Sequence, residues 1–273
     1  MEITPTLFTG VAILALACEY IDASIGMGYG TTLTPLLLII GFSPLEVIPA
    51  VLLGQLAGGL IGGFAHHRVG NISLDFRQDE RLIKQRLRGL GYLPKSFDAK
   101  VIFILAVCGV FGALVGVFSA VNMPQLILKT YIGAMVLAIG VVILVRRSHK
   151  ATFTWKGLIG VGLLSSFNKG MSGGGYGPLV TGGQIISGRE TRSSVGSTTL
   201  AEAIVCIVGF LGYLLIKGNI FWTLAAAASI GSVIAAPFAA ITVRKINAEK
   251  LKIAIGLATV VLGALILAKT FIF

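Results

Sequence analysis

Long apolar stretches alternate with short polar ones along the whole chain of 273 residues. Most approach the ~20 residues with which an α-helix crosses about 30 Å of hydrocarbon, and a soluble core could not hold so many. The pattern predicts an all-α polytopic membrane protein with about ten transmembrane or re-entrant segments. These run over 5–24, 28–40, 44–66, 100–121, 124–146, 155–169, 174–187, 191–216, 219–243 and 248–271.

The second and seventh segments are too short for ordinary spans, because thirteen helical residues measure about 20 Å. Each contains a proline, Pro35 or Pro178, and each follows a glycine-rich stretch. Proline interrupts the hydrogen-bond ladder of a helix. We therefore expect these two segments to be broken half-helices or re-entrant.

Composition and charge agree with a membrane protein. Only 12% of the residues are charged, which is too few to cover a soluble domain. If the segments alternate in direction, 18 of the 22 basic residues fall on one side of the membrane and three on the other, with Lys169 inside. The positive-inside rule then predicts a multi-pass protein of the bacterial inner membrane with both termini extracytoplasmic. The net charge of +11 indicates anionic lipid facing the loop 67–99, and no nucleic acid.

The second half of the chain resembles the first. Residues 26–30 match residues 173–177 at an offset of 147, and Gln55 falls on Glu202 at the same offset. Each copy holds five segments, and an odd number turns the second copy upside down. We expect a first five-segment repeat at 1–150 and a second, inverted five-segment repeat at 151–273. Inverted repeats with Gly- or Pro-broken segments are typical of transporters, although a channel could share them.

The chain is similar to the TauE/SafE family of sulfite exporters and organosulfur-anion transporters. The similarity rests on residues 22–35, residues 168–178, and the Gly-Asn turns at 70–71 and 218–219. The first glycine-rich copy differs from the family's form by its Met27 and Tyr29. The resemblance implies a secondary transporter that moves small sulfur-containing anions such as sulfite, sulfoacetate or other sulfonates. An anion channel of the same architecture is the alternative.

The two glycine-rich stretches are the candidate substrate site. Glycines before a helix let the backbone approach a ligand, and the helix then presents free N–H groups and a positive dipole end. The opposing interpretation is that the glycines only permit close helix packing. The predicted substrate-binding residues are Ser24, Gly26, Met27, Gly28, Tyr29, Gly30, Thr31, Lys169, Met171, Ser172, Gly173, Gly174, Gly175 and Tyr176.

Charged residues inside the apolar pattern are costly and usually functional. Lys169 could attract the anion, or it could pair with an intramembrane carboxylate. The acids Glu19, Asp22 and Glu202 could bind and release a proton during alternating access, or neutralise Lys169 or cap a broken helix. Gln55, at the position equivalent to Glu202, cannot titrate.

No other chemistry is indicated. The chain has neither a nucleotide-binding loop nor the HExxH and GxSxG motifs, so we expect no enzyme, no cofactor and no metal. His66 and His67 are predicted to lie at the membrane interface. The expected partners are the small anionic substrate and the lipid bilayer. A homodimer is compatible with the sequence, but no residue argues for one.

Overall fold

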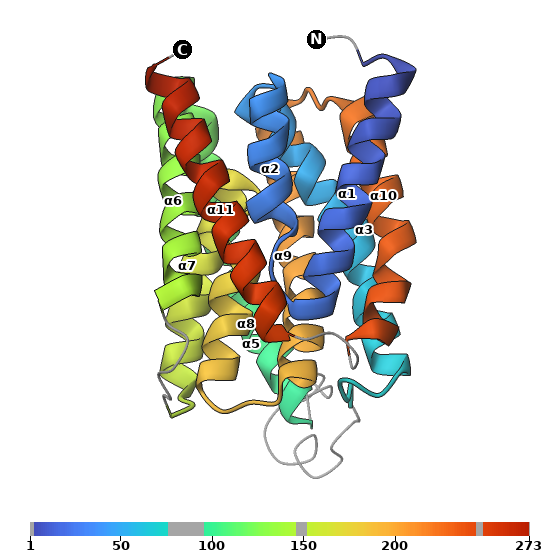
Figure 1. Ribbon diagram of the computed structural model, residues 1–273. Helices are drawn as coiled ribbons and strands as arrows, with labels where there is room; N and C mark the ends of the chain where they lie inside the picture. The colour runs from blue at the N-terminus through green and yellow to red at the C-terminus, as the bar shows by residue number, and fades with distance from the viewer. Residues whose placement is uncertain (1–2, 76–95, 146–151, 244–247, 273) are drawn as a thin grey trace.

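The computed structural model describes residues 3–75, 96–145, 152–243 and 248–272 (Figure 1). These ranges contain ten α-helices, and their residues form no β-strand. The helices are α1 (Pro5–Ile25), α2 (Tyr29–Ile40), α3 (Pro44–Arg68), α5 (Phe97–Asn122), α6 (Gln125–Val145), α7 (Trp155–Ser172), α8 (Tyr176–Ile186), α9 (Thr191–Lys217), α10 (Trp222–Thr242) and α11 (Ala248–Phe271).

Short polar residues and glycines set the helix bounds. Ser43 and Glu46 form a capping box at the start of α3, and the Ser96 hydroxyl accepts a hydrogen bond from the Ala99 N–H at the start of α5. The helices α1 and α7 end at Gly26 and Gly173, both in the left-handed conformation that glycine adopts without strain.

Seven of the described helical stretches are long and apolar enough to cross a membrane. They lie in α1, α3, α5, α6, α9, α10 and α11. Large apolar side chains such as Phe111, Leu215 and Phe238 are exposed on the outside of the bundle. Polar and charged side chains are buried inside it, the reverse of a soluble protein. The predicted multi-pass membrane protein is therefore confirmed.

The helix α7 is not among these seven candidate spans, although the apolar pattern predicted one at 155–169. Its C-terminal half carries buried polar side chains, which lower its hydropathy. They include Ser165, Ser166, Asn168, Lys169 and Ser172.

Helices from the two halves of the chain pack between one another. The helix α10 packs against α1 and α3, and α5 packs against α7 and α9. The helices α3 and α9 pack against each other, as do α6 and α11. The contacts of α1, α3 and α10 thus correspond to those of α7, α9 and α5. If each helix is exchanged with its counterpart in the other half, the set of contacts stays the same.

Both termini lie at the same end of the bundle (Figure 1). The short helix α2 lies in the half nearest the termini and α8 in the opposite half. At the end near the termini, the Lys217 ammonium donates to the Leu45 carbonyl at 2.8 Å and that of Lys269 donates to the Ile39 carbonyl at 2.7 Å. Two of the basic residues expected on the sparsely charged side therefore hold the α2–α3 connection.

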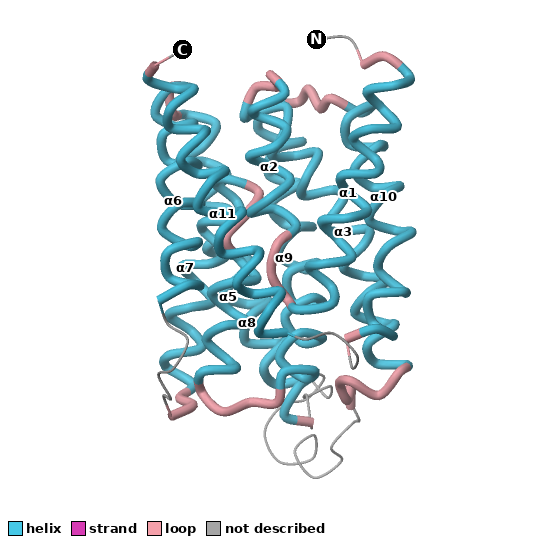
Figure 2. The backbone as a smooth tube through the Cα atoms, in the orientation of Figure 1, coloured by secondary structure: helices cyan, strands magenta, loops and turns pink. Residues whose placement is uncertain are grey.

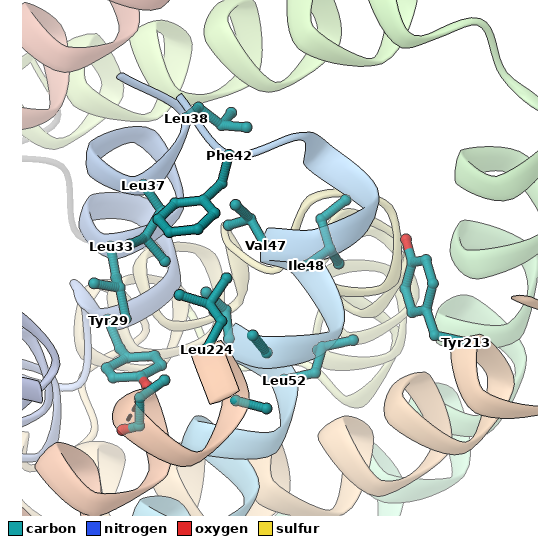
Figure 3. Close-up of a cluster of buried hydrophobic side chains, with 14 of the residues drawn as sticks. Tyr29, Leu33, Leu37, Leu38, Phe42, Val47, Ile48, Leu52, Tyr213 and Leu224 are labelled. Atoms are coloured by element: carbon teal, nitrogen blue, oxygen red, sulfur yellow. Dashed lines mark hydrogen bonds between the residues drawn. The ribbon is translucent and has the colours of Figure 1, made fainter. Parts of the chain in front are cut away.

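The largest apolar cluster packs α2, α3 and α10 together (Figure 3). Figure 3 shows the side chains of α2 and α3 pointing toward one another, with Leu224 of α10 beside them. The labelled members from α2 and α3 are Tyr29, Leu33, Leu37, Leu38, Val47, Ile48 and Leu52, all of them buried. This cluster packs α2 against its neighbours.

His66 and His67, which were predicted to lie at the membrane interface, stand in the last turn of α3, and the His66 side chain is fully buried among the helices. Its Nε2 lies 2.8 Å from the Ala23 carbonyl oxygen, and its Nδ1 lies 3.0 Å from the Asn71 amide nitrogen. A carbonyl oxygen only accepts, so Nε2 donates and Nδ1 accepts from the amide. His66 is thus a neutral structural side chain, while His67 is exposed. The described residues contain no cluster of three or more potential metal ligands.

Candidate functional site

Two short non-helical stretches interrupt the helices midway along the bundle (Figure 2). Residues 26–28 separate α1 from α2, and residues 173–175 separate α7 from α8. We call them the first break and the second break. They carry six of the fourteen predicted substrate-binding residues, and most of the others flank them.

The two breaks cross closely, and each is in backbone contact with the first turn of the short helix from the other half. A Cβ atom built on Gly30 would lie 1.8 Å from the Gly173 carbonyl oxygen, and one built on Gly177 would lie 2.5 Å from that of Gly26. Any side chain at these positions would push the breaks apart. Gly30, which was predicted at the site, and Gly177, which was not, are therefore required for this crossing of the chain.

The two breaks share one backbone pattern. Four pairs of glycines with positive φ recur, three of them at an offset of 147 and the last at 148. The pairs are Gly26 with Gly173, Gly28 with Gly175, Gly41 with Gly188, and Gly70 with Gly218. Both short helices begin with a tyrosine, Tyr29 or Tyr176.

An ion pair joins the last turn of α7, just before the second break, to α9. The Lys169 ammonium lies 2.7 Å from one carboxylate oxygen of Glu202, and both side chains are buried. Sequence alone left open whether Lys169 meets the substrate or a carboxylate. In this structure it pairs with Glu202.

At the equivalent position, just before the first break, a hydrogen bond joins the last turn of α1 to α3. The Gln55 amide donates to the Asp22 carboxylate at 3.0 Å and so joins α3 to α1. At the offset of 147, Asp22 falls on Lys169 and Gln55 on Glu202. The two halves thus repeat one contact with different charges.

Asp22 also caps α2. Its other carboxylate oxygen accepts a hydrogen bond from the Tyr29 backbone N–H at 3.3 Å. A negative charge at a helix N-terminus satisfies free N–H groups and the helix dipole. Lys169, at the equivalent position, has no acceptor atom and cannot cap α8 in this way. The first break therefore carries its own anionic group and the second carries a cation.

Glu19 is the third buried acid. Its carboxylate is fully buried, and neither oxygen has a hydrogen-bond partner among the described residues. It lies beside the positions at which Gly58 of α3 and Ser232 of α10 meet. Of the charged side chains that the structure describes as buried, three are acids and one, Lys169, is a base.

The hydroxyl groups of the predicted substrate-binding residues divide into two groups. Those of Ser24, Thr31 and Tyr176 are buried without a partner among the described residues. The Tyr29 hydroxyl donates to the Ala228 carbonyl at 3.4 Å, and the Ser172 hydroxyl donates to the Asn168 carbonyl at 2.7 Å. The structure therefore leaves only the first group free to meet a ligand.

The two predicted methionines lie in apolar surroundings. Met27 is buried with Ile25 and Ile255, and Met171 belongs to the largest apolar cluster. Two buried threonines near the breaks, Thr34 and Thr181, were not predicted. Their spacing of 147 residues is the signal that could have found them.

A second polar cluster lies at the end of the bundle away from the termini. The Arg189 guanidinium binds the Asp98 carboxylate and the Gln184 amide oxygen, donates to the Ser197 hydroxyl at 3.2 Å, and lies 5.0 Å from the centre of the Phe97 ring. It thereby ties the α8–α9 connection to α5. We call these five side chains the Arg189 clasp.

Comparison with known proteins identifies the family. The model of the family described as "Sulfite exporter TauE/SafE" matches residues 88–266, well over half of the chain. A protein of Bacillus subtilis (strain 168) described as "Probable membrane transporter protein YtnM" is 26% identical over 259 residues, which are 90% of this chain and 77% of that protein. No solved structure gives a significant match. The chain belongs to the sulfite exporter TauE/SafE family.

Proposed function

We propose that this protein is a secondary transporter of small organosulfur anions such as sulfite, sulfoacetate or related sulfonates. The anion binds where the first and second breaks meet. Membership of a family named for sulfite export supports the substrate class, and the similarity to a protein described as a probable membrane transporter supports transport.

The contact between the two breaks is the observation that carries this proposal. It brings the N-terminal ends of α2 and α8 to one place inside the bundle. Helix N-termini bind anions through free N–H groups and the dipole. Unpartnered hydroxyls of Ser24, Thr31 and Tyr176 are buried in the same region. A pyramidal or tetrahedral sulfur oxyanion has three oxygens that accept such donors.

We infer that the chain consists of two inverted repeats. The paired positive-φ glycines, the starts of α2 and α8, and the exchangeable helix contacts support this. So does the placement of α2 and α8 in opposite halves of the bundle (Figure 1). Inverted repeats with broken helices at equivalent places are typical of transporters.

Alternating access would move two groups of helices against each other. The contacts favour groups of mixed origin, since α10 packs with α1 and α3, and α5 packs with α7 and α9. The interface between them is α3 against α9, with the breaks beside it. This differs from a movement of one repeat against the other, because neither repeat packs as a separate body.

Proton coupling fits the charge balance of the interior. If Glu19, Asp22, Glu202 and Lys169 were all ionised, their net charge would be −2. Unpaired charge is costly inside a membrane, and an arriving anion would make it more negative. Protons bound with the anion would offset that cost. A simple anion channel would not require such acids, which favours the transporter.

The first experiment is anion binding to the detergent-purified protein, by thermal shift and then calorimetry. The panel holds sulfite, sulfate, sulfoacetate, taurine, acetate and phosphate. We expect selective stabilisation by sulfite or a sulfonate. A response to another anion with none to any sulfur anion would exclude the proposed substrate class. Saturable uptake of the bound anion into proteoliposomes then separates a transporter from a channel.

A further inference from the structure

Two threonines at equivalent positions keep their hydroxyls free inside the bundle. Thr34 is the sixth residue of α2 and Thr181 the sixth of α8, and their exposed fractions are 1% and 0%. Neither hydroxyl has a hydrogen-bond partner among the described residues. Buried polar atoms in native proteins are normally paired, so a free hydroxyl in such a place points to a ligand.

Three threonines elsewhere on the helices behave differently. The hydroxyls of Thr130, Thr199 and Thr242 donate to the carbonyl oxygen four residues earlier, at 2.8, 3.0 and 3.0 Å. This is the usual way in which a threonine on a helix satisfies its hydroxyl. Thr34 and Thr181 do not make this bond. Their side chains point instead toward the breaks.

Each of the two threonines lies against the break of the other half. The Thr34 hydroxyl oxygen would be 3.1 Å from a Cβ atom built on Gly173, and that of Thr181 would be 2.4 Å from one built on Gly26. Thr34 therefore lies next to the second break, and Thr181 lies next to the first. Each break receives one hydroxyl from across the bundle.

The charges beside the two hydroxyls have opposite signs. At the second break, the Gly173 N–H donates to the backbone carbonyl of Lys169, the buried cation. At the first break, the Gly26 N–H donates to that of Asp22, whose carboxylate already caps α2. Asp22 leaves the first break with a negative charge, whereas Glu202 balances the charge of Lys169, so an anion is repelled less at the second break. Equivalent hydroxyls thus stand in unequal electrostatic surroundings.

We propose that Thr34 is a ligand of the anion at the second break and that Thr181 is not. This rests on the proposed function and narrows it, since the anion then lies on the α8 side of the crossing. Its donors are the Thr34 hydroxyl from the first half of the chain and the free N–H groups of α8 from the second. Lys169, paired with Glu202, is the one buried cation that the structure describes.

The test is the replacement of each threonine by valine, which has the same shape without the hydroxyl. We expect Thr34→Val to weaken the affinity for the best sulfur anion of the panel about tenfold, the loss typical of one hydrogen bond to a charged group. Thr181→Val is the matched control and should leave that affinity within about twofold. Thr34→Ser, which restores a hydroxyl, should recover most of the loss.

Each outcome decides the matter. Equal affinities in wild type and Thr34→Val, or a larger loss in Thr181→Val, would overturn the assignment of Thr34 while leaving the transporter proposal intact. If the wild-type protein binds no sulfur anion, the proposed function fails and this assignment fails with it. Unfolding temperatures without ligand identify a variant that does not fold. In that case the affinities of Thr34→Ser and Thr34→Ala are compared, because these also differ by one hydroxyl.

Discussion

Glu202 would be left as an unpaired charge if its partner were removed. The Lys169–Glu202 pair is fully enclosed, and its two charges neutralise each other at 2.7 Å. Breaking a buried ion pair from one side costs more than replacing both partners, since the remaining charge keeps its desolvation penalty. Lys169 therefore serves folding as well as any contact with the anion.

We predict that Lys169→Met lowers the free energy of unfolding by about 3–5 kcal/mol. The double variant Lys169→Met with Glu202→Gln should recover most of this loss, because it leaves no buried charge at the pair. Chemical unfolding in detergent micelles measures both. Equal loss in the single and double variants would contradict an energetic coupling between the two residues.

Glu19 differs from the other buried acids because neither carboxylate oxygen has a partner among the described residues. Asp22, Glu202 and Lys169 are the charged groups around it. Asp22 is held by Gln55 and the Tyr29 N–H, and Glu202 by Lys169. Glu19 is therefore the acid best placed to take up and release a proton.

We predict that Glu19→Gln abolishes the dependence of anion uptake on a proton gradient while the anion still binds. The neutral amide resembles the protonated acid and cannot titrate. Uptake into proteoliposomes at several internal pH values measures this, and Asp22→Asn and Glu202→Gln are the comparisons. If Glu19→Gln keeps the gradient dependence and Glu202→Gln loses it, the proton is carried by Glu202.

Among the elements, α3 and α9 occupy equivalent positions but differ in their first halves. The α9 residues Ser194, Ser197 and Thr198 are polar, whereas Val47, Ala50 and Val51 of α3, at the offset of 147, are apolar. All six are buried. The half of the bundle near the Arg189 clasp is thus lined with hydroxyls, while the half near the termini is closed by apolar side chains.

The Arg189 clasp closes this polar half at the end away from the termini. Burial lowers the pKa of the Arg189 guanidinium and the Asp98 carboxylate opposes that effect, yet an arginine stays charged at any physiological pH. The clasp therefore holds α5, α8 and α9 together through a permanent charge.

We predict that Arg189→Ala opens this end of the bundle to water. A cysteine placed at position 198 should then react several-fold faster with a water-soluble thiol reagent, in a background in which the three native cysteines are replaced by alanine. The matched control is a cysteine at position 51, the equivalent site in α3, whose reactivity should not change. Unchanged reactivity at position 198 would show that the clasp does not restrict access.

The apolar pattern predicted the ten helices that lie in the described ranges, and most of their bounds within a few residues. The helix α5 begins three residues before its predicted apolar segment, because Ser96 caps it, and α7 ends three residues after its segment, where Gly173 caps it. At the site, the glycine match predicted where the two helix breaks lie. It did not predict that Lys169 pairs with Glu202, because that contact depends on how α7 packs against α9. Thr34 was missed although its match with Thr181 at the offset of 147 is visible in the sequence.

For the molecule as a whole, the two termini share one end of the bundle (Figure 1). That end also holds Lys217 and Lys269, while Arg189 lies at the other. The positive-inside rule assigns the end with more basic residues to the cytoplasm. The orientation in the membrane stays a prediction.

We predict that both termini are extracytoplasmic. A reporter enzyme that is active only outside the cytoplasm should be active when fused after Phe273 and inactive when fused after Gly188, in the α8–α9 connection. The reverse pattern of activities would place the basic loops outside and overturn the assigned orientation.

The interleaved packing of the two halves has a consequence for synthesis in the cell. The helices α1 and α3 enter the membrane early, but their common partner α10 is complete only at Thr242. Until then, lipid or an insertion factor must cover the faces that α10 later occupies, including the polar side of α1 with Glu19. A nascent chain stalled before Trp222 would expose that carboxyl group to the bilayer, so membrane quality control should recognise such a fragment and degrade it.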